Sequence, residues 1–128
     1  MNYYLLETKI GKGTFANKDF GIDEIIGILE GEVLSYPTRY TVQVSLREHI
    51  VPQFGKYMNH SCLPNCYLNL QDRTFRALFP ISKGSELYFD YNSTETELAA
   101  PFDCLCGSAE CCGHVMGGKF LRVVKSPY

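Results

Sequence analysis

The chain has 128 residues, which is the size of a single domain with a substantial hydrophobic core. Apolar residues make up 45% and charged residues 20%, which argues against a disordered tail or a coiled coil. Twelve Lys and Arg against fourteen Asp and Glu give a formal charge of −2, so we expect no direct contact with nucleic acid.

The sequence contains no apolar run long enough to cross a bilayer. Its first residues also lack the basic and then apolar pattern of a secretory signal. We therefore expect no membrane partner. The expected location is cytoplasmic, or nuclear in a eukaryote.

Short apolar and β-branched runs between turn residues predict a mostly β domain. In chain order, strands are predicted at residues 3–7, 14–16, 25–29, 33–34, 40–44, 66–70, 75–78 and 86–89. Residues 11–13 read Gly-Lys-Gly and predict a turn, and residues 71–73 predict the turn of a hairpin. The pair Thr94 and Glu97 is typical of a capping box and predicts one helical turn over residues 95–99, ended by Pro101.

All six cysteines lie in the second half of the chain, and a reducing compartment favours free thiols over disulfides. Cys104, Cys106 and Cys111 form a C-x-C-x4-C pattern, whose three thiolates can converge on one tetrahedral zinc ion. The competing interpretations are buried free thiols or an adventitious disulfide. A structural zinc site needs a fourth ligand, for which Cys62 and Cys66 are the candidates, with Cys112 and His114 as local alternatives.

Residues 59–65 read NHSCLPN, and residues 86–91 read ELYFDY. Alone, the first segment is compatible with a turn that contains a hydrogen-bonded histidine. Followed by ELYFDY and the cysteine loop, it resembles the NHSCxPN motif of the SET-domain protein lysine methyltransferases. Residues 11–16 resemble the glycine-rich segment of that family, and residues 102–113 resemble its post-SET loop. The resemblance extends from about residue 4 to residue 120.

This resemblance implies the SET-domain β-clip architecture of small sheets, with a C-terminal pseudoknot where the two motifs meet. It also implies a SET domain over residues 1–100, followed over residues 101–128 by a zinc-bound post-SET loop and a C-terminal tail. In the family, the cysteine of NHSC joins the three cysteines of the loop. The implied structural zinc ligands are therefore Cys62, Cys104, Cys106 and Cys111.

The implied activity is methyl transfer from S-adenosylmethionine to the ε-amine of a lysine in a protein or peptide. The displacement is in line and takes place in a tyrosine-lined channel. By the family match, Tyr91 is catalytic, Phe89 and Tyr40 line the substrate channel, and six residues bind the cofactor: Lys12, Gly13, Thr14, Tyr57, Asn59 and His60. A tyrosine at position 89 would tend to limit transfer to one methyl group, so Phe89 predicts an enzyme that is not a strict monomethylase.

The segment between Val44 and Tyr57 is shorter than in most members of that family, where it helps to bind substrate. A histone-like or other basic protein is the expected substrate class, and a homodimer could cover apolar surface that the short segment exposes. Two alternatives remain open. One is a non-catalytic, zinc-stabilised interaction module, and the other is a methyltransferase for a small amine.

Overall fold

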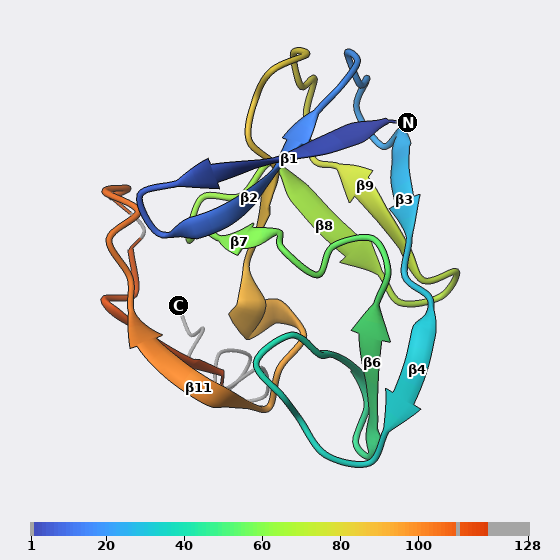
Figure 1. The fold of residues 1–128 in the computed structure, drawn as a ribbon, viewed down its shortest axis with the longest axis vertical. Coiled ribbons are helices and arrows are strands. Elements are labelled where there is room, and N and C mark those ends of the chain that lie inside the picture. The colour runs from blue at the N-terminus through green and yellow to red at the C-terminus, as the bar shows by residue number, and fades with distance from the viewer. Residues whose placement is uncertain (1, 110, 118–128) are drawn as a thin grey trace, which may run out of the picture.

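The computed structural model in Figure 1 describes residues 2–109 and 111–117, which form short strands and one 3-10 turn. The strands are β1 (Tyr3–Thr8), β2 (Gly11–Ala16), β3 (Ile25–Ile28), β4 (Gly31–Leu34), β5 (Val42–Ser45), β6 (Glu48–Pro52), β7 (Asn59–His60), β8 (Cys66–Asn69), β9 (Thr74–Ala77), β10 (Tyr88–Phe89), β11 (Glu97–Asp103) and β12 (His114–Gly117). The 3-10 turn, η1, covers Tyr91–Ser93. The prediction of a mostly β fold is confirmed.

The strands form five small sheets among the described residues. Two sheets have three strands each, in the orders β3-β9-β8 and β4-β6-β5, and the β1-β2 and β11-β12 pairs are antiparallel. The remaining sheet pairs β7 with β10 in parallel. In the sequence, 27 residues lie between the end of β7 and the start of β10. This pairing brings the two motif segments together, as expected at the predicted pseudoknot.

The strands predicted at residues 3–7, 25–29 and 40–44 correspond to β1, β3 and β5, within a few residues at each end. The predicted hairpin is also confirmed, because β8 and β9 pair in antiparallel register around the turn. The predicted boundary at residue 100 lies inside β11, and residues 118–128 of the predicted tail lie outside the described residues.

The turn predicted at residues 11–13 is wrong, because these residues belong to β2 and pair with the end of β1. The chain reverses at residues 9–10 instead. There the Thr8 hydroxyl donates to the Gly11 carbonyl at 2.7 Å and accepts from the Ile10 N–H at 3.2 Å. The threonine hydroxyl thus stabilises the turn at residues 9–10, whereas the two glycines had suggested a turn at residues 11–13.

The helical turn predicted at residues 95–99 is also wrong. The only helical turn in the described chain is η1, which Asp90 caps by accepting from the Asn92 N–H, and β11 follows from Glu97. The Thr94 hydroxyl donates to the Glu95 carboxylate at 2.8 Å instead of capping a helix. The predicted capping box therefore does not form, because these local side-chain hydrogen bonds replace it.

The hydrophobic core lies between the sheets and is rich in aromatic rings. Ring contacts run from Tyr3 to Phe54 (4.8 Å between centroids), from Phe54 to Phe75 (5.6 Å) and from Phe75 to Phe89 (5.4 Å). All three pairs are edge to face, the arrangement that the charge distribution of aromatic rings favours. The core therefore reaches from β1 to β10 through a continuous series of rings.

Gly27 in β3 is needed for this packing, because a Cβ atom there would lie 2.3 Å from the Phe54 ring. We expect Gly27→Ala to lower the free energy of unfolding by about 1–3 kcal/mol, since Phe54 must move against its ring neighbours. Urea denaturation measures the change. Gly21→Ala is the matched control, because the nearest atom to its Cβ is 3.9 Å away; an equal loss in both variants would contradict the packing role of Gly27.

Candidate functional site

The candidate site lies where β7 and β10 run side by side. Tyr88 is opposite Asn59, and Phe89 is opposite His60. The Ser61 N–H extends the pairing by donating to the Phe89 carbonyl at 3.3 Å. Residues from both motifs are therefore brought into one place by a short parallel pair.

The Asn65 side chain reinforces this pairing. Its Nδ2 donates to the Glu86 carbonyl at 2.9 Å, and its Oδ1 accepts from the Tyr88 N–H at 2.9 Å. One amide thus satisfies a backbone acceptor and a backbone donor on the opposite segment, as a third strand would. The last residue of NHSCLPN consequently fixes the start of β10.

Asn59 connects the same place to β2. Its Nδ2 donates to the Lys12 carbonyl at 3.2 Å and to the Glu86 carboxylate at 2.9 Å. Gly13 approaches that carboxylate so closely that a Cβ atom would lie 2.7 Å from its Oε2. Three of the predicted cofactor residues, Lys12, Gly13 and Asn59, are therefore neighbours.

Glu86 is a site residue to which sequence reasoning gave no role, although it begins the ELYFDY segment. Its carboxylate accepts from the Tyr88 hydroxyl at 2.8 Å as well as from Asn59. Burial, followed by this hydrogen bond, raises the pKa of Tyr88 to about 12. Glu86 thus links the side chain of Asn59 in β7 to the side chain of Tyr88 in β10.

The predicted cofactor residue Thr14 is buried in β2, and its carbonyl accepts from the Leu87 N–H at 2.8 Å. Its hydroxyl has no hydrogen-bond partner among the described residues. Thr14 therefore joins β2 to the segment that precedes β10 through its backbone.

Tyr57 and Tyr40 form an aromatic pair with centroids 5.8 Å apart. Lysine side chains lie over both rings: the Lys12 Nζ is 5.0 Å from the Tyr57 centroid, and the Lys56 Nζ is 5.3 Å from the Tyr40 centroid. Tyr40 keeps 41% of its surface exposed. The structure thus groups a predicted cofactor residue with a predicted channel residue beside two cations.

Tyr91 follows β10 directly and begins η1. Its hydroxyl donates to the Met58 carbonyl at 2.6 Å, and its ring contacts Phe89 at 4.9 Å. Burial raises the pKa of Tyr91 well above its ordinary value. The hydroxyl therefore stays protonated at neutral pH and has lone pairs that can accept a hydrogen bond.

Phe89, the other predicted channel residue, is buried between Phe75 and Tyr91. It is the last ring of the core series and the first neighbour of Tyr91. The structure thus packs the predicted catalytic residue directly against the core.

The His60 imidazole is completely buried, with no exposed side-chain surface. Its Nδ1 accepts from the Tyr91 N–H at 3.0 Å, and its Nε2 lies 3.2 Å from the Cys62 Sγ. Any contact of His60 with a cofactor would therefore involve its backbone, because both ring nitrogens already have protein partners.

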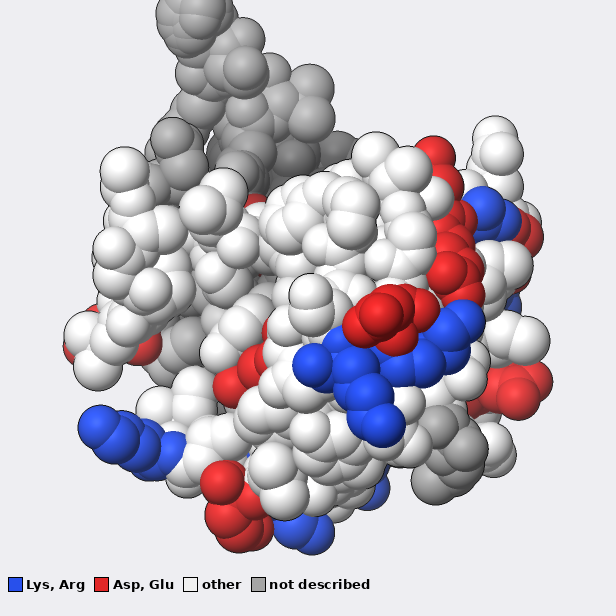
Figure 2. Space-filling model, turned by 90° about the horizontal axis from the view of Figure 1, so that it is seen from above, with Lys and Arg blue, Asp and Glu red and all other residues white. Residues whose placement is uncertain are grey.

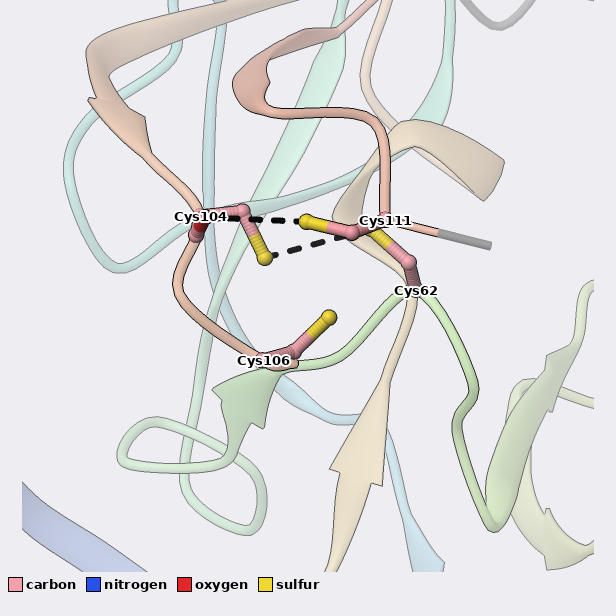
Figure 3. Close-up of side chains that lie close together, drawn as sticks. All are labelled: Cys62, Cys104, Cys106 and Cys111. Atoms are coloured by element: carbon pink, nitrogen blue, oxygen red, sulfur yellow. Dashed lines mark hydrogen bonds between the residues drawn. The ribbon is translucent and has the colours of Figure 1, made fainter. Parts of the chain in front are cut away.

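Four cysteine thiols converge, as Figure 3 shows, and one of them, that of Cys62, is the neighbour of the His60 ring. Their Sγ atoms all lie within 4.8 Å of one another, and the four residues are Cys62, Cys104, Cys106 and Cys111. A tetrahedral zinc ion with Zn–S bonds of about 2.3 Å requires sulfur atoms about 3.8 Å apart. The Cys62 and Cys104 sulfurs are separated by 3.9 Å, so the arrangement fits such an ion.

The protonation chemistry of the cluster also suits a cation. Burial raises the pKa of Cys62 and raises that of Cys104 to about 11, so these thiols need a positive charge to ionise at neutral pH. Hydrogen bonds from the Ser108 hydroxyl and N–H lower the pKa of Cys106 to about 5. The group thus combines one thiol of lowered pKa with others that a metal would deprotonate.

The remaining candidates for the fourth ligand lie outside this group of four. Cys66 is in the hydrophobic core, where burial raises the pKa of its thiol to about 12, and His114 bonds to the Asp103 carboxylate at 2.9 Å. The exposed Cys112 has its Sγ 3.4 Å from the Cys62 Sγ. Cys112 is therefore a neighbour of the cluster, and Cys62 is the residue that completes it geometrically.

A second buried polar group, which sequence reasoning missed, lies beyond η1. The Glu95 carboxylate accepts from the Gln43 N–H at 2.8 Å, and the Gln43 side-chain carbonyl accepts from the Thr96 N–H at 2.7 Å. No local sequence signal marks a pair 52 residues apart. These bonds attach the chain after Tyr91 to β5.

The outer surface carries charges of both signs. Figure 2, which views the molecule from above, shows acidic atoms lying across a cluster of basic ones. In residues 2–109 and 111–117, no helix is long and apolar enough to cross a membrane.

Comparison with known proteins gives one family match, to the SET domain, over residues 11–92. Methyltransferase flvH of Aspergillus flavus is 40% identical over 65 residues, which cover 49% of this chain and 36% of that protein. The H3 lysine-36-specific histone-lysine N-methyltransferase of Gibberella zeae is 29% identical over 136 aligned positions, covering 87% of this chain and 14% of that protein. The chain thus spans about a third or less of the length of these relatives.

Among solved structures, the fold resembles the crystal structure of KRYPTONITE in complex with mCHG DNA and SAH. The TM-score is 0.70 at 18% identity, and the match covers 89% of this chain and 29% of that one. The likeness is one of fold.

The Asn65 bonds predict a large effect of removing this side chain. Asn65→Ala leaves the Tyr88 N–H and the Glu86 carbonyl without their partner, which should cost about 2–4 kcal/mol of unfolding free energy. Chemical denaturation measures the loss. Asn69→Ala is the control, because its Oδ1 accepts only an exposed turn N–H; a comparable loss there would argue against a special role for Asn65.

Proposed function

The chain belongs to the SET-domain family, and we propose that it transfers a methyl group from S-adenosylmethionine to the ε-amine of a lysine in a protein or peptide. The observation that carries the proposal is the meeting of the two motifs at β7 and β10, where Asn59 pairs with Tyr88 and the His60 ring accepts the Tyr91 N–H. The histone-lysine methyltransferase relative supports the reaction class, and the SAH complex of the structural neighbour supports the methyl donor.

The reaction requires a neutral lysine nitrogen. A free lysine has a pKa of about 10.4, so deprotonation at pH 7 costs about 4–5 kcal/mol. Apolar rings around the amine, and the positive sulfonium of the donor, both lower that cost. The rings that Phe89 and Phe102 present to Tyr91, at 4.9 and 5.9 Å, supply such surroundings.

Tyr91 would orient the nucleophile without acting as a base. Its proton is committed to the Met58 carbonyl, and burial keeps the phenol from ionising. The hydroxyl oxygen can then accept an N–H of the neutral amine and direct the nitrogen lone pair toward the methyl group. The gain comes from alignment of nitrogen, carbon and sulfur.

The methyl donor would lie against β2 and β7. Its contacts would come from the backbone of Lys12, Gly13 and Thr14, from Asn59 and the His60 backbone, and from the Tyr57 ring. When bound, S-adenosylmethionine supplies an activated methyl on a good leaving group. The closeness of Asn59 to Lys12 and Gly13 supports this arrangement.

We also infer that Cys62, Cys104, Cys106 and Cys111 hold a structural zinc ion. The ion would fasten the loop that follows β11 to the NHSCLPN segment, beside Tyr91. The role of Phe89 in product multiplicity and the place of Tyr40 in the channel stay predictions. A basic protein substrate, a homodimer and an intracellular location remain predictions.

Tyr91→Phe should reduce methyl transfer about a hundredfold or more, because the amine loses its orienting acceptor. Mass spectrometry of methylated lysine peptides, with free lysine as a parallel substrate, measures the rate and separates protein from small-amine activity. Zinc content and donor binding should stay close to those of the unaltered chain. The control is Tyr36→Phe, at a tyrosine that is 57% exposed; undiminished activity in Tyr91→Phe would remove Tyr91 from the mechanism.

Cys62→Ser should lower zinc affinity at least tenfold, because serine cannot supply a thiolate. Elemental analysis and competition with a chromogenic chelator measure zinc content and affinity. The matched variant Cys112→Ser should retain one zinc per chain. If Cys112→Ser loses the metal and Cys62→Ser keeps it, Cys112 is the fourth ligand.

A further inference from the structure

The His60 imidazole is a direct bridge between the cysteine cluster and Tyr91. Its two ring nitrogens face opposite ways, toward the Tyr91 N–H at 3.0 Å and the Cys62 Sγ at 3.2 Å. The ring also packs edge to face against the Tyr91 ring, with centroids 5.3 Å apart. Because the imidazole has no exposed side-chain surface, a water molecule cannot replace either hydrogen-bond partner.

These contacts determine the tautomer. Because a backbone N–H donates to Nδ1, that nitrogen carries a lone pair, and the ring proton must be on Nε2. The Asp90 Oδ1 lies 3.6 Å from Nδ1, too far for a hydrogen bond. The Nε2 proton therefore points at the Cys62 sulfur and stabilises negative charge on it.

We propose that His60 is a positioning residue that couples the zinc cluster to the proposed catalytic tyrosine. This role rests on the proposed function of Tyr91. The N–H donated to Cys62 strengthens metal retention, and the lone pair offered to the Tyr91 N–H fixes the backbone from which the tyrosine hydroxyl is directed. Groups in the second shell of a metal typically change affinity or activity 10- to 100-fold when they are replaced.

Two substitutions separate the two bonds. His60→Asn can keep an acceptor near the position of Nδ1 and lacks the donor to Cys62, whereas His60→Gln can keep an N–H near Nε2 and lacks the acceptor. We expect His60→Asn to release zinc to a chelator about tenfold faster, with a smaller loss of kcat than His60→Gln when zinc is in excess. His60→Gln should retain zinc and lose about tenfold in kcat, with little change in KM.

The Cys112 N–H also donates to the Cys62 Sγ, at 3.2 Å, so zinc affinity in His60→Asn should fall without being abolished. Amide NMR provides a readout that needs no activity. The Tyr91 N–H should exchange with solvent faster in His60→Gln, which lacks its acceptor, and stay protected in His60→Asn. The matched control is His114→Asn, since His114 is exposed and pairs with Asp103.

Faster zinc release confined to His60→Asn, together with the larger loss of kcat and the faster Tyr91 N–H exchange in His60→Gln, supports the coupling. Equal zinc loss in both variants, no effect in either, or equal exchange of the Tyr91 N–H in both would overturn it. If the unaltered chain binds zinc but methylates nothing, the proposed function fails, while zinc release and exchange of the Tyr91 N–H still decide whether His60 couples the two sites.

Discussion

The pairing of β7 with β10 is the constraint on which the site depends, and by itself it is weak. Each strand has two residues, and parallel pairing is slightly less stable per residue than antiparallel pairing. The surrounding side chains compensate. The Asn65 amide bonds to the backbone on either side of Leu87, and the His60 ring accepts the Tyr91 N–H. The polar side chains of the NHSCLPN segment thus stabilise a two-stranded sheet that its own backbone hydrogen bonds are too few to stabilise.

The core supports the same place from the other side. A series of rings runs from Tyr3 through Phe54, Phe75 and Phe89 to Tyr91, so that the last ring of the core packs on the first ring of the site. Close packing of this kind resists small displacements. Alignment of a nucleophile with a methyl group tolerates little displacement, so a rigid mounting suits the proposed reaction.

Sequence reasoning predicted which distant segments meet better than it predicted the local backbone. The family resemblance implied that the NHSCLPN and ELYFDY segments meet, and the β7-β10 pair confirms it. The roles of Asn59, Cys62 and Tyr91 in the reaction stay predictions. The turn at residues 11–13 and the helical turn at 95–99 were wrong, because a threonine hydroxyl in one case and a buried glutamate in the other decided the local structure. Sequence reasoning did not predict the hydrogen bonds of the Glu86 and His60 side chains, because their partners are 27 and 31 residues away.

The most direct test of the proposed function is calorimetric titration of S-adenosylmethionine into the zinc-loaded chain, since it requires no knowledge of the substrate. The proposal predicts saturable binding at one site per chain, weakened when Asn59 is replaced by alanine. Absence of binding to folded, zinc-loaded protein would contradict it and would leave a zinc-stabilised interaction module as the better description of this domain.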